Sequence, residues 1–413
     1  MGVFFIKKDS VQTVNKNKEL VIILILGALA AIGPFSIDMY LPGFPAIAAD
    51  LHTDIAHVGL SLTSYFIGIS VGQLVYGPLI DRFGRRRPLL FGLLLYMAAA
   101  AFCAFAPTIH WLIGLRLLLA LGGCVGMVAS RAVVRDLFPP SETARVFSTL
   151  LLVMGVAPIV APTIGGYVTA LLGWRFIFAV LFGISVLVFF AVLRYLPESK
   201  PEDKSISLHP ANITKKFWTV LKDQTFRSYA IAGSFGSAGM FAYITGSPYV
   251  YMEILGFTEQ QYGWLFGLNA FGLIAASQFN RVLLKRRSSA DITLLAGTLQ
   301  FLTGLLLILS SAFGLIPLSA VLVLIFSYLV WQGFIFPNAT ALALEPFTTH
   351  AGSASALIGS MQMVVGAVAS GLVSYFHDGT AVPMAAIMAV CTSIAFVALL
   401  GAKINPRVAP AVS

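Results

Sequence analysis

A single carboxylate stands at the end of a long apolar segment. Residues 21–35 read VIILILGALAAIGPF, and the next stretch, SIDMYLP (residues 36–42), contains Asp38. An ionised carboxylate loses its hydration in lipid or in a dry interior, so an intramembrane acid marks an ion or proton pathway by default. Asp38 is therefore a candidate proton-binding group. The alternative is a structural polar residue at the outer membrane interface.

Arg116 lies inside another apolar stretch, WLIGLRLLLALGG (residues 111–123). An arginine in hydrocarbon is costly and is usually paired or faces water. At 1.5 Å per residue, Asp38 lies about 27 Å along its helix from the inner surface, and Arg116 about 9 Å below the outer surface. In a hydrocarbon core about 30 Å thick, both fall in the outer third. We therefore predict that Arg116 lies near Asp38 in a central cavity.

Further polar and aromatic side chains are candidates to line that cavity. Tyr243, Ser247 and Tyr251 recur every four residues and share one helical face, which suits flat, apolar molecules. A packed aromatic stripe explains them equally well, and Pro248 is expected to break this helix. Intramembrane amides either line a cavity or form hydrogen bonds between helices. The predicted cavity residues are Tyr40, Gln73, Tyr243, Ser247, Asn269, Gln332, Asn338 and Gln362.

The elements that must position these side chains are membrane-spanning helices. Of 413 residues, 58% are hydrophobic and only 10% are charged, against about 25% charged in soluble domains. A spanning helix needs about 20 mostly apolar residues. Twelve such segments are predicted, at residues 20–42, 57–79, 88–106, 111–134, 145–171, 176–196, 228–252, 261–282, 290–312, 317–343, 353–376 and 381–402.

The placement of charge predicts the orientation. The net charge is +9, and of 26 Lys and Arg residues all but Arg116 and Arg175 lie on one side of the predicted helices. This follows the positive-inside rule, so both termini are predicted to be cytoplasmic, and no nucleic-acid partner is expected. The three cysteines fall inside helices, and the six histidines show no metal-ligand spacing. No disulfide, metal or cofactor is therefore expected.

A polar stretch divides the helices six and six. The predicted domains are an N-terminal six-helix bundle (1–196), a cytoplasmic linker (197–225) and a C-terminal six-helix bundle (226–413). DRFGRRR (81–87) and NRVLLKR (280–286) follow the second and eighth helices, as expected for parallel repeats. The linker segment ANITKKFWTVLKD (211–223) is either a short amphipathic surface helix or a solvated connection. Each chain holds both halves of the cavity, so a monomer is expected.

The loop GPLIDRFGRRR (77–87) joins the second and third helices through a short turn. Gly84 can adopt φ > 0, and Asp81 can pair with a basic residue or lie near a helix N-terminus. The arginines can bind anionic lipid headgroups. We predict a gating latch rather than a merely topogenic basic loop. Its residues are Gly77, Asp81, Arg82, Gly84, Arg85 and Arg86.

The fifth predicted helix carries GVAPIVAPTIGG (155–166). Small residues at intervals of three and four let backbones approach closely in lipid, and proline kinks a helix. We predict a hinge and seal against the eighth helix, and ordinary close packing is the alternative. The residues concerned are Gly155, Pro158, Pro162, Gly165 and Gly166.

Four charged residues lie at the predicted cytoplasmic ends of helices. We expect them to form a network that stabilises an outward-open state. The alternative is that they only anchor the helix ends to lipid headgroups. These residues are Arg131, Arg135, Asp136 and Glu345.

These motifs resemble those of the major facilitator superfamily, whose signature loop is similar to residues 77–87. SIDMYLP (36–42), SRAVVRDLF (130–138) and FPNATALALEPFTTHAGSASALIGSMQ (336–362) resemble the bicyclomycin-resistance group of twelve-helix drug/proton antiporters, over about residues 20–402. The resemblance implies an all-α membrane protein with the major facilitator fold of two six-helix bundles. It also implies that residues 155–166 form an exporter motif and that Arg116 occupies a functional position.

The resemblance predicts a proton-coupled antiporter of the bacterial inner membrane that exports small amphipathic drugs, chloramphenicol- or bicyclomycin-like, by alternating access. Asp38, with Arg116, would be the coupling site. Some such exporters carry a second acid about two turns earlier, where this chain reads GALAAIG (27–33); one acid favours neutral or zwitterionic substrates. Alternatives are an exporter of an amino acid, peptide or siderophore, and proton-coupled uptake. No enzyme is expected. The partners are the small molecule, protons and membrane lipid.

Overall fold

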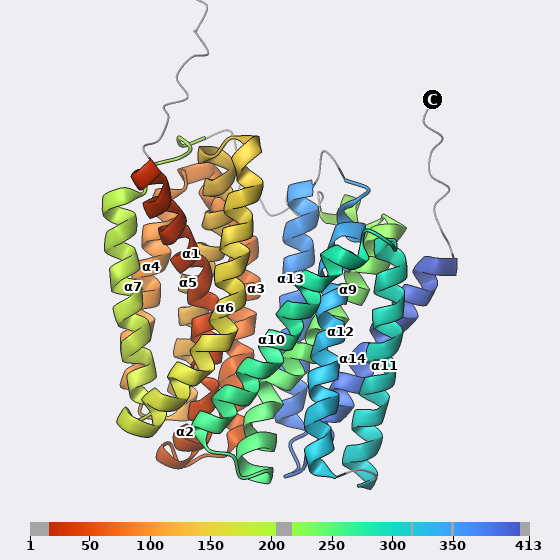
Figure 1. The fold of residues 1–413 in the computed structure, drawn as a ribbon. Coiled ribbons are helices and arrows are strands. Elements are labelled where there is room, and N and C mark those ends of the chain that lie inside the picture. The colour runs from red at the N-terminus through yellow and green to blue at the C-terminus, as the bar shows by residue number, and fades with distance from the viewer. Residues whose placement is uncertain (1–15, 204–216, 315–316, 348–350, 405–413) are drawn as a thin grey trace, which may run out of the picture.

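The computed structural model describes residues 16–203, 217–314, 317–347 and 351–404. Within these ranges, twelve long helices form two bundles (Figure 1). The N-terminal bundle contains α1 (Lys16–Asp38), α3 (Ile55–Phe83), α4 (Arg86–Ala104), α5 (Ile109–Leu137), α6 (Pro140–Leu172) and α7 (Arg175–Tyr195). The C-terminal bundle contains α9 (Gln224–Pro248), α10 (Glu259–Leu283), α11 (Ser289–Phe313), α12 (Leu318–Leu344), α13 (Ala351–Tyr375) and α14 (Val382–Ile404).

Each of the twelve predicted segments is confirmed as a helix, with ends within about five residues of the prediction, and at two of these ends the helical geometry changes. The first helix ends at Asp38, four residues earlier than predicted, and a turn leads into a short 3₁₀ turn, η1 (Leu41–Gly43), and a short helix, α2 (Phe44–Asp50). The seventh helix loses its α geometry at Pro248, as predicted, and continues as a π-helical turn, η2 (Tyr249–Ile254). Proline lacks the N–H group that an α-helix needs, which accounts for both changes near Pro42 and Pro248.

Helix starts are fixed by side chains that accept hydrogen bonds from free backbone N–H groups. Asp54 accepts from the N–H of His57 at 2.7 Å, and Asp223 caps α9 in the same way. Thr258 forms a capping box with Gln261 at the start of α10. Such caps are each worth about 1 kcal/mol, so they define where the chain enters each bundle.

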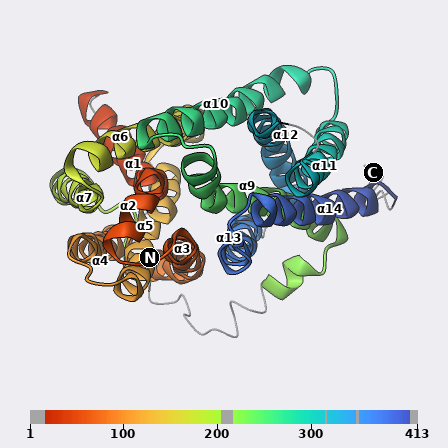
Figure 2. The same ribbon diagram turned by 90° about the horizontal axis from the view of Figure 1, so that it is seen from below.

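Ten helices of the described chain are long and apolar enough to cross a membrane, and α9 and α10 are not among them. Both have 25 residues, enough for a span, but they carry polar side chains such as Ser234 and Asn269. Seen along the bundles, α9 lies near the centre of the molecule (Figure 2). A helix covered by neighbouring helices need not be apolar all round.

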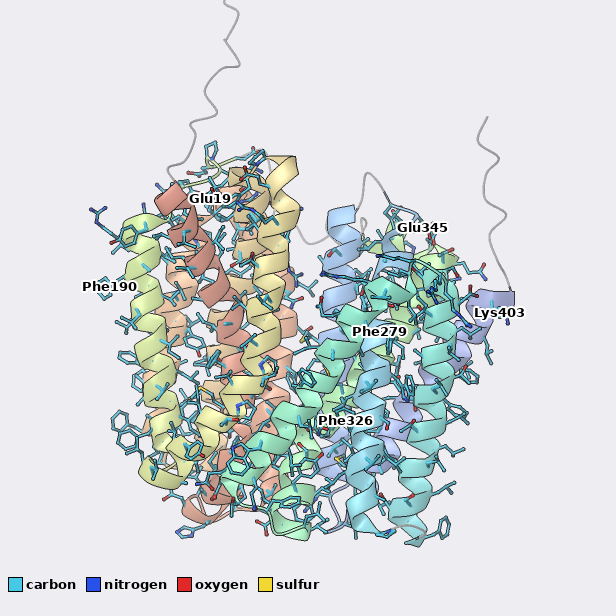
Figure 3. The ribbon with its side chains drawn as sticks, in the orientation of Figure 1. Glu19, Phe190, Phe279, Phe326, Glu345 and Lys403 are labelled. Carbon is cyan, nitrogen blue, oxygen red and sulfur yellow. The ribbon has the colours of Figure 1, made fainter. Side chains whose placement is uncertain are left out.

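The molecule has two distinct ends. We call the end that contains the α3–α4 turn the basic end, since Arg82, Arg85, Arg86 and Arg87 gather there. Glu19, Glu345 and Lys403 lie toward the same end, whereas Phe190 lies on the outer face of α7 (Figure 3). The opposite end, with α2 and η2, is called the far end. The ribbons of the two bundles approach each other there and diverge toward the basic end (Figure 1).

Candidate functional site

Arg116 is the most deeply buried charged group of the N-terminal bundle, with no exposed surface. Its Nη1 donates a 2.8 Å hydrogen bond to the backbone carbonyl of Ser36 on α1. The rings of Tyr40 and Tyr65 lie 4.3 and 4.4 Å from the guanidinium carbon, which places the cation between two aromatic faces. Nε and Nη2 have no hydrogen-bond partner among the described residues. Arg116 thus ties α5 to the end of α1 and to α3.

Hydroxyl groups complete the surroundings of Arg116. The Tyr40 hydroxyl shares a 2.7 Å hydrogen bond with Ser61, and Ser36 shares one of 2.6 Å with Tyr96. Tyr40 is therefore engaged with Arg116 and α3, rather than free to meet a ligand in this state. Sequence reasoning missed Ser61, Tyr65 and Tyr96, because a lone hydroxyl or aromatic residue in an apolar helix has the same sequence pattern as simple packing.

Asp38 is buried, with 4% of its surface exposed, and its carboxylate forms no hydrogen bond or ion pair with any described residue. Arg116 is predicted to lie near Asp38, but the two form no ion pair, and Arg116 donates to the Ser36 carbonyl. Asp38 lies within electrostatic range of Tyr65 on α3 and of Tyr262 on α10, without a hydrogen bond to either. The carboxylate therefore lies at the junction of the two bundles.

The C-terminal bundle buries a neutral cluster where α9, η2 and α10 meet. The side-chain amide of Asn269 donates to the hydroxyls of Tyr243 and Tyr251, at 2.9 and 3.1 Å. The Tyr243 ring stacks on Phe266 with centroids 5.6 Å apart. The structure thus brings the predicted Tyr243 and Asn269 together.

Tyr262 of α10 extends this cluster. It shares a 2.9 Å hydrogen bond with Ser247, and the two rings of Tyr251 and Tyr262 lie 5.8 Å apart. We name Tyr243, Tyr251 and Tyr262 the tyrosine cluster. Tyr262 was missed from the sequence because no spacing rule connects α9 with the start of α10.

Two predicted cavity amides form hydrogen bonds within the C-terminal bundle. Gln332 on α12 lies 3.0 Å from the Gln300 amide on α11 and 3.2 Å from the Ser237 hydroxyl on α9. Asn338 on α12 donates to Asn280 on α10 at 2.8 Å. Hydrogen bonding between helices, the second of the two predicted roles, therefore describes them in this structure.

One contact between the two bundles runs along α6 and α10 and is tightest at the far end. A Cβ atom on Gly166 would lie 2.5 Å from the Glu259 carbonyl oxygen, and one on Gly263 would lie 2.8 Å from the Pro162 carbonyl oxygen. At Gly155, about three turns closer to the basic end, the nearest atom would be 3.6 Å away. Residues 155–166 therefore pack against α10, and the clearance widens toward the basic end; the predicted roles of hinge and seal stay a prediction.

The remaining residues of that motif join α6 to its own bundle or bend it. A Cβ atom on Gly165 would lie 2.2 Å from the Met39 carbonyl oxygen, directly after Asp38. Pro158 and Pro162 both lie inside α6. Only glycine fits where α6 crosses the end of α1 this closely.

The second contact between the bundles joins α3 to α13 through polar groups. Thr63 and Ser370 share a 2.8 Å hydrogen bond, and Ser370 is also bonded to Thr245 at 2.7 Å. Gln73 lies against α13, since a Cβ atom on Gly359 would be 2.8 Å from its Oε1. The Nε2 of Gln362 is buried on α13 without a hydrogen-bond partner among the described residues.

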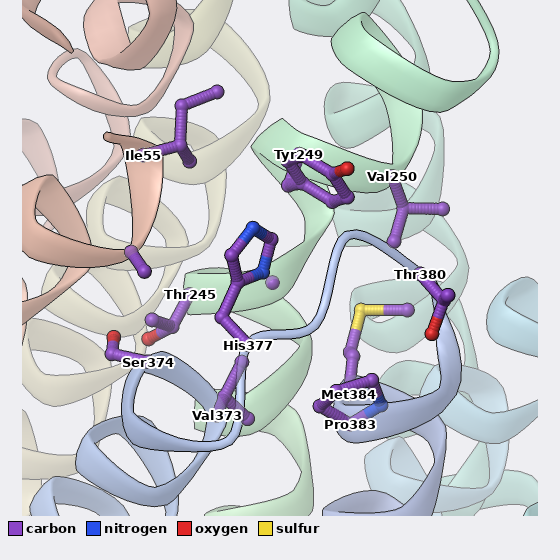
Figure 4. Close-up of a pocket in the computed structure, with 12 residues that line it drawn as sticks. Ile55, Thr245, Tyr249, Val250, Val373, Ser374, His377, Thr380, Pro383 and Met384 are labelled. Carbon is purple, nitrogen blue, oxygen red and sulfur yellow. The ribbon is translucent and has the colours of Figure 1, made fainter.

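A small cavity lies at the far end, between α3 of the N-terminal bundle and α9, η2 and α13 of the C-terminal bundle. Its volume of about 20 Å³ has room for about one water molecule. Figure 4 shows Ile55 of α3 facing Tyr249 and His377 of the C-terminal bundle. The Tyr249 and His377 rings meet edge to face, 4.3 Å apart. The far end is thus closed around this space.

At the basic end, the α3–α4 turn is held by an ion-pair network. Gly84 has φ +82°, as the predicted tight turn requires. Arg85 donates to Asp81 at 2.5 Å and to Asp136 of α5 at 2.8 Å. Burial alone would lower the pKa of the Arg85 guanidinium, but the two carboxylates hold that pKa above its usual value. Of the other predicted latch residues, Gly77 faces open space and Arg82 lies over the Phe83 ring at 5.7 Å.

The start of the linker lies across this turn, which the sequence did not predict. The Glu198 carboxylate accepts hydrogen bonds from the backbone N–H groups of Arg85 and Arg86, at 2.7 and 3.2 Å. The Ser199 hydroxyl donates to Asp136 at 3.0 Å. We call residues 197–203 the linker strap. An acid at the first turn of α4 is favoured by the free N–H groups and the helix dipole.

The four charged residues predicted to form a network do not pair with one another here. Asp136 binds Arg85 and Ser199, while Arg131, Arg135 and Glu345 are exposed at the basic end. Their network was predicted for an outward-open state and stays a prediction. Among the described residues, no group of three or more His, Cys, Asp or Glu residues could hold a metal ion.

Comparison with known proteins places this architecture in a family. Residues 24–370 match the model described as Major Facilitator Superfamily. The chain is 37% identical over 391 residues to "Uncharacterized MFS-type transporter YdgK" of Bacillus subtilis, covering 93% of this chain and 96% of the relative. It is 34% identical over 387 residues to "Bicyclomycin resistance protein homolog" of Haemophilus influenzae, with the same two coverages.

The fold is shared with more distant solved structures. The crystal structure of a D-xylose-proton symporter superposes with a TM-score of 0.72 at 13% identity, covering 92% of this chain and 96% of that one. Members of the matched family are transporters rather than enzymes. The chain therefore belongs to the major facilitator superfamily of multi-pass membrane transporters, and within it is similar to the bicyclomycin-resistance group.

Proposed function

We propose that the protein exports small, neutral, amphipathic antibiotics in exchange for protons. The observation that carries this proposal is the position of Asp38, a buried carboxylate without a cationic partner at the junction of the two bundles. An ionised carboxylate there carries a desolvation cost that protonation or contact with water removes. A movement of one bundle against the other would change that cost.

The proposed cycle uses this dependence. When the junction opens to one side, water reaches Asp38 and the proton can leave. When the junction closes, Tyr262 returns beside the carboxylate and the protonated form is favoured. A drug that enters the open junction and donates a hydrogen bond to the ionised carboxylate would take the place of the water, so that the deprotonated junction can close around the drug. The junction closes least easily when it is deprotonated and holds no drug. The protein therefore changes state only with a proton or a drug bound, which gives exchange.

We assign the basic end to the cytoplasm of a bacterial inner membrane, with both termini on that side, because lysine and arginine residues gather there. The far end is closed and the bundles diverge toward the basic end, so the structure represents an inward-facing state. We further propose that residues 1–196 and 226–413 form the two domains, joined by the linker 197–225, and that the protein works as a monomer.

The tyrosine cluster supports the proposed substrate class. Its side chains offer aromatic faces and hydroxyl groups without a formal charge. Among the residues that the structure describes, Asp38 is the one buried acid, so no second buried carboxylate is offered there to bind a dication. Chloramphenicol- and bicyclomycin-like molecules have this neutral, amphipathic character, and one relative carries the name bicyclomycin resistance protein homolog. We propose that the other predicted cavity residues line the cavity in the state in which the far end is open. These residues are Tyr40, Gln73, Ser247, Gln332, Asn338 and Gln362.

The energetics suit a proton-driven exporter. One proton moving inward across 100 mV releases about 2.3 kcal/mol. That free energy supports a substrate gradient of about fifty-fold per proton, at 1.4 kcal/mol per tenfold.

Uptake of labelled chloramphenicol into inverted membrane vesicles tests the proposal. Vesicles that contain the protein should accumulate the drug when an inside-acid gradient is imposed, and a protonophore should abolish the accumulation. Vesicles without the protein are the control. Accumulation that resists the protonophore would contradict proton coupling. Absence of accumulation across chloramphenicol, bicyclomycin and a panel of amino acids and siderophores would contradict export itself.

A further inference from the structure

A lipid-facing groove separates α3 from α4 near the basic end. Its volume is about 520 Å³, and almost all of its surface is apolar. Its walls and floor are formed by Val75, Leu79, Phe83, Phe91, Leu95 and Leu121. None of these side chains contributes to the junction around Asp38, so the groove is a separate feature.

The groove exists because α3 and α4 pack on different faces of α5. A Cβ atom on Gly68 of α3 would lie 2.6 Å from Ala120, and one on Gly92 of α4 would lie 2.5 Å from Val125. At 100° per residue, Leu121 points between the directions of Ala120 and Val125. It therefore forms the floor of a gap that neither neighbouring helix can close.

The gap opens away from the interior of the bundle. On the opposite face of α5, a Cβ atom on Gly126 would lie 2.7 Å from the Leu29 carbonyl oxygen of α1. Leu121 faces the other way, and the rims at Val75 and Phe91 are 48% and 66% exposed. In a membrane, the medium at this face is lipid.

The length and charge of the groove match one lipid chain. It runs along α3 from Gly72 to Phe83, about 16 Å at 1.5 Å per residue. This is about half of a 30 Å hydrocarbon core, the depth of one leaflet. Arg87 lies at its basic end with its side chain 78% exposed, and its ion pair with Glu202 is long, at 3.6 Å. A long, exposed pair of this kind is weak, so Arg87 is available to an anion.

We propose that this groove binds one acyl chain of an anionic phospholipid whose phosphate is held by Arg87. The chain fills the space between α3 and α4, and the headgroup lies beside the α3–α4 turn. Arginine is the side chain best suited to bind a phosphate group, and basic residues at this depth attract anionic headgroups. The lipid would thus become part of the structure that supports the latch.

Native mass spectrometry of the full chain tests this proposal. The protein is purified in detergent, stripped of lipid and titrated with dioleoyl phosphatidylglycerol or dioleoyl phosphatidylethanolamine. We expect one phosphatidylglycerol to bind about tenfold more tightly than phosphatidylethanolamine. Val75→Trp, which fills the groove, and Arg87→Gln should each weaken that binding about tenfold, which corresponds to about 1.4 kcal/mol.

Two matched variants control for general effects on the lipid-exposed surface. Val323→Trp adds the same bulk at an exposed position of α12, and Arg194→Gln removes a charge from an exposed position at the basic end of α7. Both should bind phosphatidylglycerol as the wild type does. Equal binding by all five proteins would mean annular lipid only and would overturn the site. Equal affinity for the two lipids would overturn its anionic preference. Because Arg87 is exposed, Arg87→Gln should fold and give a lipid-binding measurement even if Val75→Trp does not fold.

Discussion

The two bundles fill their interiors with different chemistry. The N-terminal bundle buries charges, Arg116 and Asp38, whereas the C-terminal bundle buries amides and hydroxyls such as Asn269 and the tyrosine cluster. Every amide contact around Asn269, Gln332 and Asn338 joins neutral groups. In the proposed mechanism, the first bundle holds the proton, and the second presents a neutral surface to the drug and to Asp38.

The same contrast recurs at equivalent loops. At the end of α3, Asp81 binds Arg85, and Asp136 of α5 binds the same arginine, which ties the turn to α5. After α10, Asn280 takes the place of Asp81 in the repeated motif and forms a neutral hydrogen bond to Asn338 of α12. Ionic contacts in a low-dielectric region are strong when made and costly when broken, whereas amide contacts exchange more readily. The N-terminal bundle is therefore the one whose contacts should respond to proton binding.

Removing the buried cation of Arg116 should reduce transport more than any other change in this comparison of the two bundles. We predict that Arg116→Gln lowers proton-driven export at least about a hundredfold, because the cation between Tyr40 and Tyr65 and its bond to Ser36 are both lost. The measurement is drug accumulation in inverted vesicles, normalised to the amount of folded protein. Arg116→Lys keeps the charge without the planar fork and should recover only part of the activity. Full activity of Arg116→Gln would show that the charge is dispensable.

A change to the neutral bundle should weaken substrate binding and leave coupling intact. Asn269→Leu removes both hydrogen bonds to the tyrosine cluster, so the KM for the drug should rise about tenfold, at about 1 kcal/mol or more per lost bond. The number of protons moved per drug should not change. The matched control is Thr298→Val on α11, whose hydroxyl bonds only its own helix. Loss of proton coupling in Asn269→Leu would contradict the division of roles.

Weakening the contacts of the linker strap should have the smallest effect on stability and on transport. Glu198→Gln weakens the charge-assisted bonds at the start of α4, and Tm should fall by only about 1 °C because the site is exposed. Transport should fall less than about threefold. Lys200→Gln, on the same strap, should change neither quantity. A severe loss of transport in Glu198→Gln would make the strap part of the gating machinery rather than a support.

Local patterns made most of the fold predictable. Apolar runs gave the twelve helices, and Gly84 and Pro248 marked a turn and a helix break, because such signals depend on a few neighbouring residues. Contacts between distant residues were harder to predict. Depth along the helices placed Arg116 level with Asp38, but depth says nothing of direction around a helix. Arg116 binds the backbone carbonyl of Ser36, a group that no side-chain pattern marks in the sequence. The linker strap has the composition of a solvated connection, so its binding to the turn had no sequence signal.

Drug-coupled proton release in proteoliposomes tests the central role of Asp38 most directly. The pH change on adding chloramphenicol and the exchange of labelled for unlabelled drug without a gradient are recorded for wild type and for Asp38→Asn. Glu253→Gln, an exposed acid at the far end, is the matched control. Wild type and the control should release protons and exchange drug, whereas Asp38→Asn should exchange drug without releasing protons. Proton release by Asp38→Asn equal to that of the wild type would contradict the assignment of Asp38 as the coupling site.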